Sequence, residues 1–213
     1  MFIYFLILIL IMSKAYSIEG DVIVLNRELN ELDYFVRDFL DVLKKHSNYL
    51  VVSGYVSICT GRFRGTEDVD VLVLLPSLEQ FSKLFEDLYS HSFWCLQNDN
   101  FEECYNDYLT KQINLRFARK DQTGPNIEFI PVTKIKKIQF FELVHPQKIR
   151  IKDFEFKVPP LEFEILYKEI KLGSEKDFED ALHLRTMFFD ILKEENFKYF
   201  KKIITKDEIN NKV

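Results

Sequence analysis

Hydrophobic and polar residues alternate along this chain with the periods of helices and short strands. Apolar residues at helical spacing follow two capping residues, Asn26 and Ser77, and predict a helix after each. Short apolar or alternating runs between turn residues predict a series of strands. The strands are expected at 18–24, 49–54, 68–75, 93–96, 111–120 and 126–131, with two more in 148–159. Short helices are expected at 55–60 and 101–109.

The last quarter of the chain has a helical pattern. Pro159-Pro160 marks a boundary, and two helices are predicted beyond it, over 161–172 and from 175 to about 193. Gly173 suits the C′ position of the first helix, where a left-handed backbone is needed, and Ser174 suits the N-cap of the second. The order of elements is therefore a mixed set of strands and helices, followed by helices alone.

This order predicts an α/β (α+β) fold with a mixed central sheet flanked by helices and a C-terminal helical lobe. The core domain is expected over 18–158 and the lobe over 159–213. Residues 1–17 are an apolar leader or a mis-annotated start. Their apolar run is about half of what a membrane span needs, and it resembles the hydrophobic part of a signal peptide except that no Lys or Arg precedes it.

A peripheral membrane anchor is the third interpretation of this leader. We favour a translation start at Met12, because the rest of the chain has the composition of a cytoplasmic protein, and we expect no stable membrane partner. The three cysteines lack disulfide or metal spacing, which favours reduced thiols in an intracellular protein. The four histidines are scattered, so zinc is not expected. With 47% hydrophobic residues among 213, the chain can bury one good core.

Two aspartates begin a strand that is otherwise apolar. Asp68 and Asp70 are two residues apart, so their side chains point to the same face of the strand, while Val71 to Leu75 are apolar on both faces. Two like charges on one face of an interior strand repel each other. A divalent cation removes this conflict, and Mg²⁺ prefers carboxylate oxygens together with phosphates and water. A solvated strand end is the alternative for an isolated Asp-x-Asp.

The flanking residues favour the metal-binding alternative. Ser53-Gly54 ends a strand and leads into a short helix, where backbone N–H groups can approach a phosphate. Arg64 and Thr66 stand just before the aspartates and offer a cation and a hydroxyl.

The segment SGYVSICTGRFRGTEDVDVLV resembles the signature of the polymerase-beta-type nucleotidyltransferases. That signature is a Gly-Gly or Gly-Ser turn, a short helix and Arg-x-Thr-x-Asp-hydrophobic-Asp. The resemblance implies that Asp68 and Asp70 bind the metals and that Ser53 and Gly54 form the phosphate-binding turn. It also implies a third carboxylate on a later strand. Glu128 in NIEFIP is the candidate, since Ile127 and Phe129 face the other way; Glu142 is the second choice.

The C-terminal segment YKEIKLGSEKDFEDALHL is similar to the abortive-infection nucleotidyltransferases, which act as toxins in bacterial toxin–antitoxin pairs. Lys168, Lys176, Asp177 and Asp180 match that family's motif in order. The resemblance implies that Lys168 contacts the nucleotide phosphates and that Lys176 and Asp177 line the cleft. Asp177 also has the spacing of a capping box with Ser174, which is the structural alternative.

Together these resemblances imply an enzyme that uses Mg²⁺ or Mn²⁺ and transfers a nucleoside monophosphate from a nucleoside triphosphate such as ATP. The acceptor is the hydroxyl of an RNA, such as a tRNA, or of a protein. The net charge of −5 does not indicate nucleic-acid binding, but local basic clusters favour RNA. These are Lys134, Lys136 and Lys137; Lys148, Arg150 and Lys152; and Lys198, Lys201 and Lys202. The toxin family implies an antitoxin partner. A catalytically inactive binding module or partner subunit is the alternative function.

Overall fold

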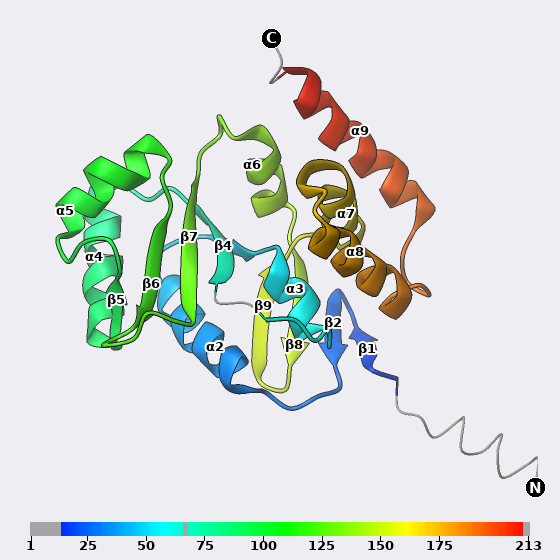
Figure 1. Cartoon of the computed structure of the whole chain (residues 1–213), viewed down its shortest axis with the longest axis horizontal. Coiled ribbons are helices and arrows are strands. Elements are labelled where there is room, and N and C mark those ends of the chain that lie inside the picture. The colour runs from blue at the N-terminus through cyan, green and yellow to red at the C-terminus, as the bar shows by residue number, and fades with distance from the viewer. Residues whose placement is uncertain (1–13, 66–67, 211–213) are drawn as a thin grey trace, which may run out of the picture.

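A computed structural model describes residues 14–65 and 68–210, and Figure 1 shows the arrangement of its elements. The strands are β1 (Tyr16–Glu19), β2 (Val22–Leu25), β3 (Tyr49–Val51), β4 (Asp68–Leu74), β5 (Phe93–Cys95), β6 (Leu115–Arg119), β7 (Asn126–Val132), β8 (Gln147–Ile151) and β9 (Phe154–Val158). The helices are α2 (Glu31–Leu43), α3 (Gly54–Cys59), α4 (Leu78–Ser90), α5 (Phe101–Glu103), α6 (Lys137–Val144), α7 (Leu161–Tyr167), α8 (Glu175–Met187) and α9 (Glu194–Asn210). The expected α/β fold class, with a mixed sheet, flanking helices and a helical C-terminal part, is confirmed.

The main sheet has five strands in the order β3-β4-β7-β6-β5. Its interior strands β4 and β7 are parallel to each other, and the remaining pairs are antiparallel. Because successive side chains alternate between the two faces, β4 and β7 send Val69, Val71, Ile127 and Phe129 to one face. That face packs on α2 and α4 through aromatic contacts such as the one between Phe81 and Phe129. This layer is the main core.

The opposite face of β4 and β7 changes character along the strands. Its first positions are the acidic residues Asp68, Asp70 and Glu128, and its later positions, such as Leu72 and Ile130, are apolar. Helix α6 covers the apolar part, where Leu72 clusters with Leu143 and neighbouring residues. The acidic start of the strands is therefore left beside the helical lobe instead of being covered by α6.

A second sheet was not anticipated from the sequence. It has four strands in the order β1-β2-β8-β9, and β2 is parallel to β8. It brings the first described residues next to 147–158, a pairing across more than 120 residues. Tyr16 in β1 is buried and its ring contacts that of Phe188, so the folded part begins before residue 18, the expected start of the core. Residues 1–13 of the leader lie outside the described residues.

Helix α2 begins later than the sequence suggested. Asn26 was the expected N-cap, but the cap is Asn30, whose side chain accepts a hydrogen bond from the backbone of Asp33 while the Asp33 carboxylate accepts one from Asn30. The carboxylate of Asp33 also receives two hydrogen bonds from Arg27, at 2.6 and 2.9 Å. This reciprocal capping box satisfies two backbone donors and outcompetes a single cap at Asn26.

The C-terminal helices follow the predicted boundary signals. Gly173 has the expected left-handed conformation with φ of 67°, and Ser174 caps α8 through a capping box with Asp177. A π-helical turn over Lys168–Leu172 continues α7. Helix α8 ends at Met187, earlier than the expected position near 193, and the chain then turns into α9. Phe200 and Ile204 of α9 pack on Phe163 of α7, and α8 also contacts α7, so the three helices form one lobe.

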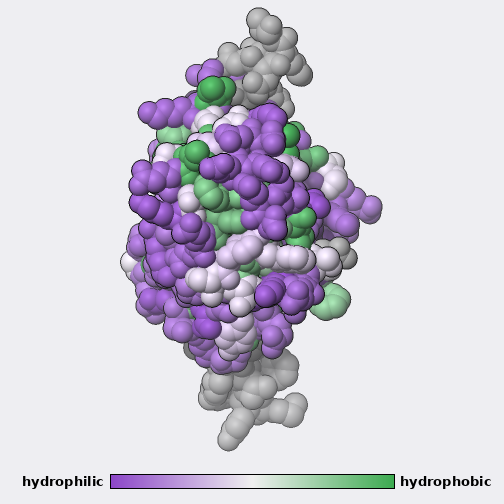
Figure 2. Space-filling view, turned by 90° about the vertical axis from the view of Figure 1, so that its left-hand side faces the viewer, coloured by the Kyte–Doolittle hydropathy of each residue, from purple (hydrophilic) through white to green (hydrophobic). Residues whose placement is uncertain are grey.

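The surface of the described part is mostly polar on the side that carries α5 and β5. Figure 2 shows hydrophilic side chains over most of this side, with small hydrophobic areas between them. Among the helices in residues 14–65 and 68–210, none combines the length and the hydrophobicity that crossing a membrane requires.

Candidate active site

The candidate site is built on the parallel pair of strands β4 and β7. Their register places Asp68 opposite Asn126 and Asp70 opposite Glu128. Residues opposite each other on neighbouring strands share a face and lie about 5 Å apart. The structure thus brings Asp70 beside Glu128, two of the three carboxylates expected to form the site. Asp68 accepts a hydrogen bond of 2.7 Å from the amide nitrogen of Asn126.

The carboxyl group of Asp70 is a weaker acid than that of an ordinary aspartate. Burial and the neighbouring Glu128 carboxylate raise the pKa of Asp70 to about 6, although a hydrogen bond from the Ser53 side chain opposes this shift. Glu128 accepts a hydrogen bond of 2.9 Å from Asn114, and Arg116 lies 3.9 Å from the same Glu128 oxygen. Asp70 and Glu128 therefore place two like charges side by side, a conflict that a divalent cation would relieve.

The oxygen atoms present suit a hard cation. Within the described ranges, no three His, Cys, Asp or Glu side chains converge closely enough to hold a metal ion by themselves. Mg²⁺ commonly takes only one or two protein carboxylates and completes its shell with substrate phosphates and water. The pair of Asp70 and Glu128 matches that requirement, and Asp68 lies at the next position on the same face of β4.

The Ser53-Gly54 turn is tightly constrained. Ser53 has φ of 64° and ψ of −132°, a backbone conformation that side chains disfavour. Gly54 lies under the guanidinium of Arg64: a Cβ at position 54 would come within 3.2 Å of an Arg64 nitrogen. Only glycine permits this close approach without displacement of Arg64. The turn thus fixes two of the residues that the sequence singled out, Ser53 beside Asp70 and Gly54 beside Arg64.

We expect Ser53→Gly to change two quantities, the free energy of unfolding and the pKa of Asp70, for different reasons. Glycine removes the backbone strain, which should increase the free energy of unfolding by about 1 kcal/mol. The same change removes the hydroxyl that hydrogen-bonds to Asp70, so the pKa of Asp70 should rise further. Chemical denaturation tests the first effect, and NMR titration of the Asp70 carboxyl tests the second. Ser53→Ala, which loses the hydroxyl but keeps the strain, should show only the pKa effect.

Basic residues expected near the phosphates converge on a single carboxylate. Asp180 of α8 is fully buried. Its oxygens contact Arg64 at 2.7 Å, Lys168 at 3.0 Å and also Arg62. Lys168 is itself fully buried and lies 3.3 Å from an oxygen of Glu164. This network connects the loop before β4 to the helical lobe and offsets the charges of both Arg64 and Lys168.

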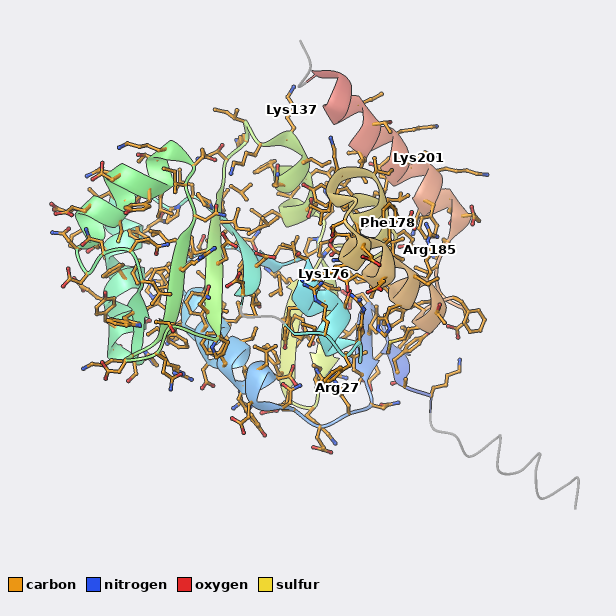
Figure 3. All side chains as sticks on the ribbon, viewed as in Figure 1. Arg27, Lys137, Lys176, Phe178, Arg185 and Lys201 are labelled. Atoms are coloured by element: carbon orange, nitrogen blue, oxygen red, sulfur yellow. The ribbon has the colours of Figure 1, made fainter. Side chains whose placement is uncertain are left out.

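The remaining predicted residues lie in the first turn of α8 or outside the described residues. Lys176, labelled in Figure 3, is exposed at the start of α8, and its carbonyl accepts a hydrogen bond from Arg62. Asp177 forms the capping box with Ser174, so the structural alternative for this residue is observed. Thr66 lies outside the described residues.

A cavity adjoins the acidic pair. It has a volume of about 200 Å³ and lies between the main sheet, α6 and α7, with Asp70 and Ser53 in its wall. Two further acids line it, Glu142 and Glu164, and both are almost completely buried. Burial raises the pKa of both carboxyl groups, and the charge of Glu164 raises that of Glu142 further.

Sequence reasoning missed part of this environment. Glu142 was considered only as a third metal ligand, and Glu164 and Arg62 were not considered. An acidic residue in a strongly apolar segment, such as Glu142 in IQFFELV or Glu164 in LEFEILY, is a signal of buried charge that could have identified two of them. The contacts of Arg62 depend on the position of α8 and leave no local signal.

No protein-family model matches the chain, and no curated protein matches its sequence. Among solved structures, the lincosamide antibiotic adenylyltransferase LnuA with bound lincomycin aligns with 76% of this chain and 99% of its own, at 14% identity and a TM-score of 0.49. An antigenic nucleotidyltransferase-like protein from Paracoccidioides brasiliensis aligns with 82% of this chain and 88% of its own, at 13% identity and a TM-score of 0.49. We therefore base the function on the contacts of the acidic site.

Proposed function

We propose that this protein is a nucleotidyltransferase that transfers a nucleoside monophosphate from a nucleoside triphosphate to a hydroxyl group. The observation that carries the proposal is the pairing of Asp70 with Glu128 on neighbouring parallel strands. The register supports the assignment of Glu128, rather than Glu142, as the carboxylate that joins the Asp68–Asp70 pair. The nucleotidyltransferase signature in the sequence supports the same residues.

The proposed roles of these side chains follow from their contacts. Asp70 and Glu128 hold the divalent ion, Mg²⁺ or Mn²⁺, with Asp68 as the third carboxylate. Bound there, the ion would neutralise the charge of the phosphates, including the departing pyrophosphate, and would favour ionisation of the attacking hydroxyl. Asn114 and Ser53 orient the Glu128 and Asp70 carboxylates. Such orienting partners keep the oxygens in place when the phosphates arrive.

Cationic side chains also lie next to the acidic site. Three lysines, Lys136, Lys137 and Lys171, line a cavity of about 350 Å³. This cavity shares Gln139 and Tyr167 with the one beside Asp70. We place the triphosphate beside Lys136 and Lys137, because Arg64 and Lys168 already pair with Asp180. In this arrangement Arg64 and Lys168 do not contact the phosphates. They hold α8 of the lobe in place through Asp180, and Lys176 remains a candidate phosphate contact.

The acceptor is proposed to be an RNA, such as a tRNA, or a protein. The predicted basic cluster at Lys148, Arg150 and Lys152 is paired with nearby carboxylates, which weakens its support for RNA. Lys137 at the start of α6 and Lys201 on α9 point away from the body of the protein in Figure 3. These two elements contact each other, so they are the better candidate for an RNA-binding surface. A toxin role with an antitoxin partner follows from the family resemblance alone.

The proposal is tested by label transfer. The protein is incubated with α-labelled nucleoside triphosphates, Mg²⁺ and either total RNA or total protein. Glu128→Gln is expected to reduce labelling at least about 100-fold, because it removes one of the paired carboxylates. Glu86→Gln, which changes an exposed glutamate on α4, should label like the wild type. Equal labelling by the wild type and Glu128→Gln would refute the assignment.

A catalytically inactive binding module is the second candidate. It is favoured by the finding that no three metal-binding side chains converge in the described ranges. This candidate predicts that the wild type binds nucleotide, measured by calorimetry, but transfers no label to any acceptor in a whole lysate.

A further inference from the structure

The cavity beside Asp70 has an unusual composition. Its walls are apolar over much of their area, with Leu72, Ile130 and Leu172 among the lining residues. Its polar part includes the carboxyl groups of Asp70, Glu142 and Glu164. None of the described residues that line it is a lysine or an arginine. An anionic phosphate would therefore meet only like charge here, so the cavity is a separate compartment from the lysine-lined one.

The carboxyl group of Glu142 has no hydrogen-bonding or ion-pair partner among the described residues. Its side chain lies on α6 and the residue is only 3% exposed. Among residues 14–65 and 68–210, no hydrogen bond or ion pair to its carboxyl group is found, and Glu164 adds a like charge that acts on it. Buried carboxyl groups are normally paired or hydrogen-bonded, because removing them from water is costly. An unpartnered acid facing a cavity points to a ligand that supplies the missing donor.

Glu164 is only partly satisfied. One of its oxygens is buried without a hydrogen bond, although Lys168 lies 3.3 Å away. Lys168 is shared with Asp180, to which it is closer, at 3.0 Å. The ammonium of Lys168 is therefore shared by two carboxylates, those of Glu164 and Asp180. As a result, Glu142 and Glu164 together have more acceptor oxygens than donors.

The size of the cavity limits its occupant. A volume of about 200 Å³ is below the range of roughly 300–1,000 Å³ that holds a drug-sized ligand. A whole nucleotide does not fit such a space, whereas a short alkyl arm does. Apolar walls suit the stem of that arm, and the two carboxyl groups suit an ammonium with several N–H donors. A hydrated Mg²⁺ ion would leave the apolar walls unmatched.

We propose that this cavity binds a protonated primary amine of the acceptor, close to the hydroxyl that is modified. The inference rests on the proposed nucleotidyltransferase function, since Asp70 connects the two sites. Glu142 and Glu164 accept hydrogen bonds from the ammonium, and Leu72, Ile130 and Tyr167 contact its alkyl stem. The acceptor class is thereby narrowed to hydroxyl compounds that carry an amine, including lysine-containing protein segments.

The test is ligand-induced thermal stabilisation of the full chain, without nucleotide or metal. n-Butylammonium chloride is compared with tetramethylammonium chloride at the same concentration, because the second cation has no N–H donor. At concentrations well above its dissociation constant, n-butylammonium is expected to raise the melting temperature of the wild type by about 3 °C. The shift should be lost in Glu142→Gln, which keeps the side-chain shape, and kept in Glu86→Gln. Circular dichroism checks that each variant is folded.

Several outcomes would overturn the inference. These are no shift with n-butylammonium, an equal shift with tetramethylammonium, or an undiminished shift in Glu142→Gln. A Glu142-dependent shift with adenosine or MgCl₂ but not with n-butylammonium would assign the cavity to a nucleobase or a metal instead. If the wild type transfers label but n-butylammonium does not stabilise it, the amine subsite is rejected and the proposed function stands. If n-butylammonium stabilises the wild type but no label is transferred, the proposed function is rejected and the amine subsite stands.

Discussion

Replacing Asp180 by alanine is expected to reduce the free energy of unfolding by about 3–5 kcal/mol, the largest stability effect of any single substitution considered for this chain. Asp180 is fully buried, and its carboxylate contacts Arg62, Arg64 and Lys168. Its removal leaves the buried Lys168 with only Glu164 as a partner and removes the contact of Arg64 with the lobe, whereas Arg62 keeps Glu179 and the carbonyl of Lys176. A buried cation that loses part of its compensating charge costs more than the lost contact itself.

The neighbouring Glu179 provides a matched control. It contacts Arg62 as well, but its side chain is 58% exposed. Glu179→Ala should therefore change stability by less than about 1 kcal/mol. Urea denaturation of both variants measures the difference. A loss in Asp180→Ala no greater than that in Glu179→Ala would show that the network contributes little and that the lobe is held by apolar packing alone.

Asp70→Asn is expected to abolish transfer and, at neutral pH, to stabilise the protein. Activity should fall at least about 1,000-fold, because a metal-binding carboxylate is lost. Stability should increase because the folded state raises the pKa of Asp70 from 3.8 to about 6. A carboxyl with a raised pKa binds its proton more tightly when folded, so ionising it above pH 6 costs stability. Asparagine removes that cost, roughly 3 kcal/mol.

The pH dependence identifies the cause. Below about pH 4 the native Asp70 is protonated, and Asp70→Asn should have nearly the stability of the wild type. The extra stability of Asp70→Asn over the wild type should develop between pH 4 and pH 6 and remain constant above pH 6. Denaturation of both proteins in the presence of a chelator measures this stability difference without bound metal. The exposed Asp99→Asn serves as control and should show no such window. A gain that is independent of pH would mean that packing, not ionisation, is responsible.

Local signals in the sequence located most elements but not all boundaries. The capping box at Ser174 and the left-handed Gly173 were read correctly, because they depend on residues within one turn. The start of α2 was misplaced, since Asn26 and Asn30 offer similar caps and only the reciprocal bond with Asp33 selects the second. The pairing of β2 with β8 joins segments more than 120 residues apart, and no local pattern encodes it.

The sequence by itself determined the acidic strand. Apolar residues on both faces make β4 an interior strand, and a spacing of two places Asp68 and Asp70 on one face, whatever lies around them. Only the tertiary structure decided what surrounds that face. The parallel register with β7 chose Glu128 as the neighbour of Asp70, and the docking of α8 turned Asp180 into a shared partner for three cations. The docking of α6 and α7 enclosed Glu142 and Glu164 in a cavity. Side-chain direction within an element follows from backbone geometry over a few residues, whereas these contacts depend on the packing of segments distant in sequence.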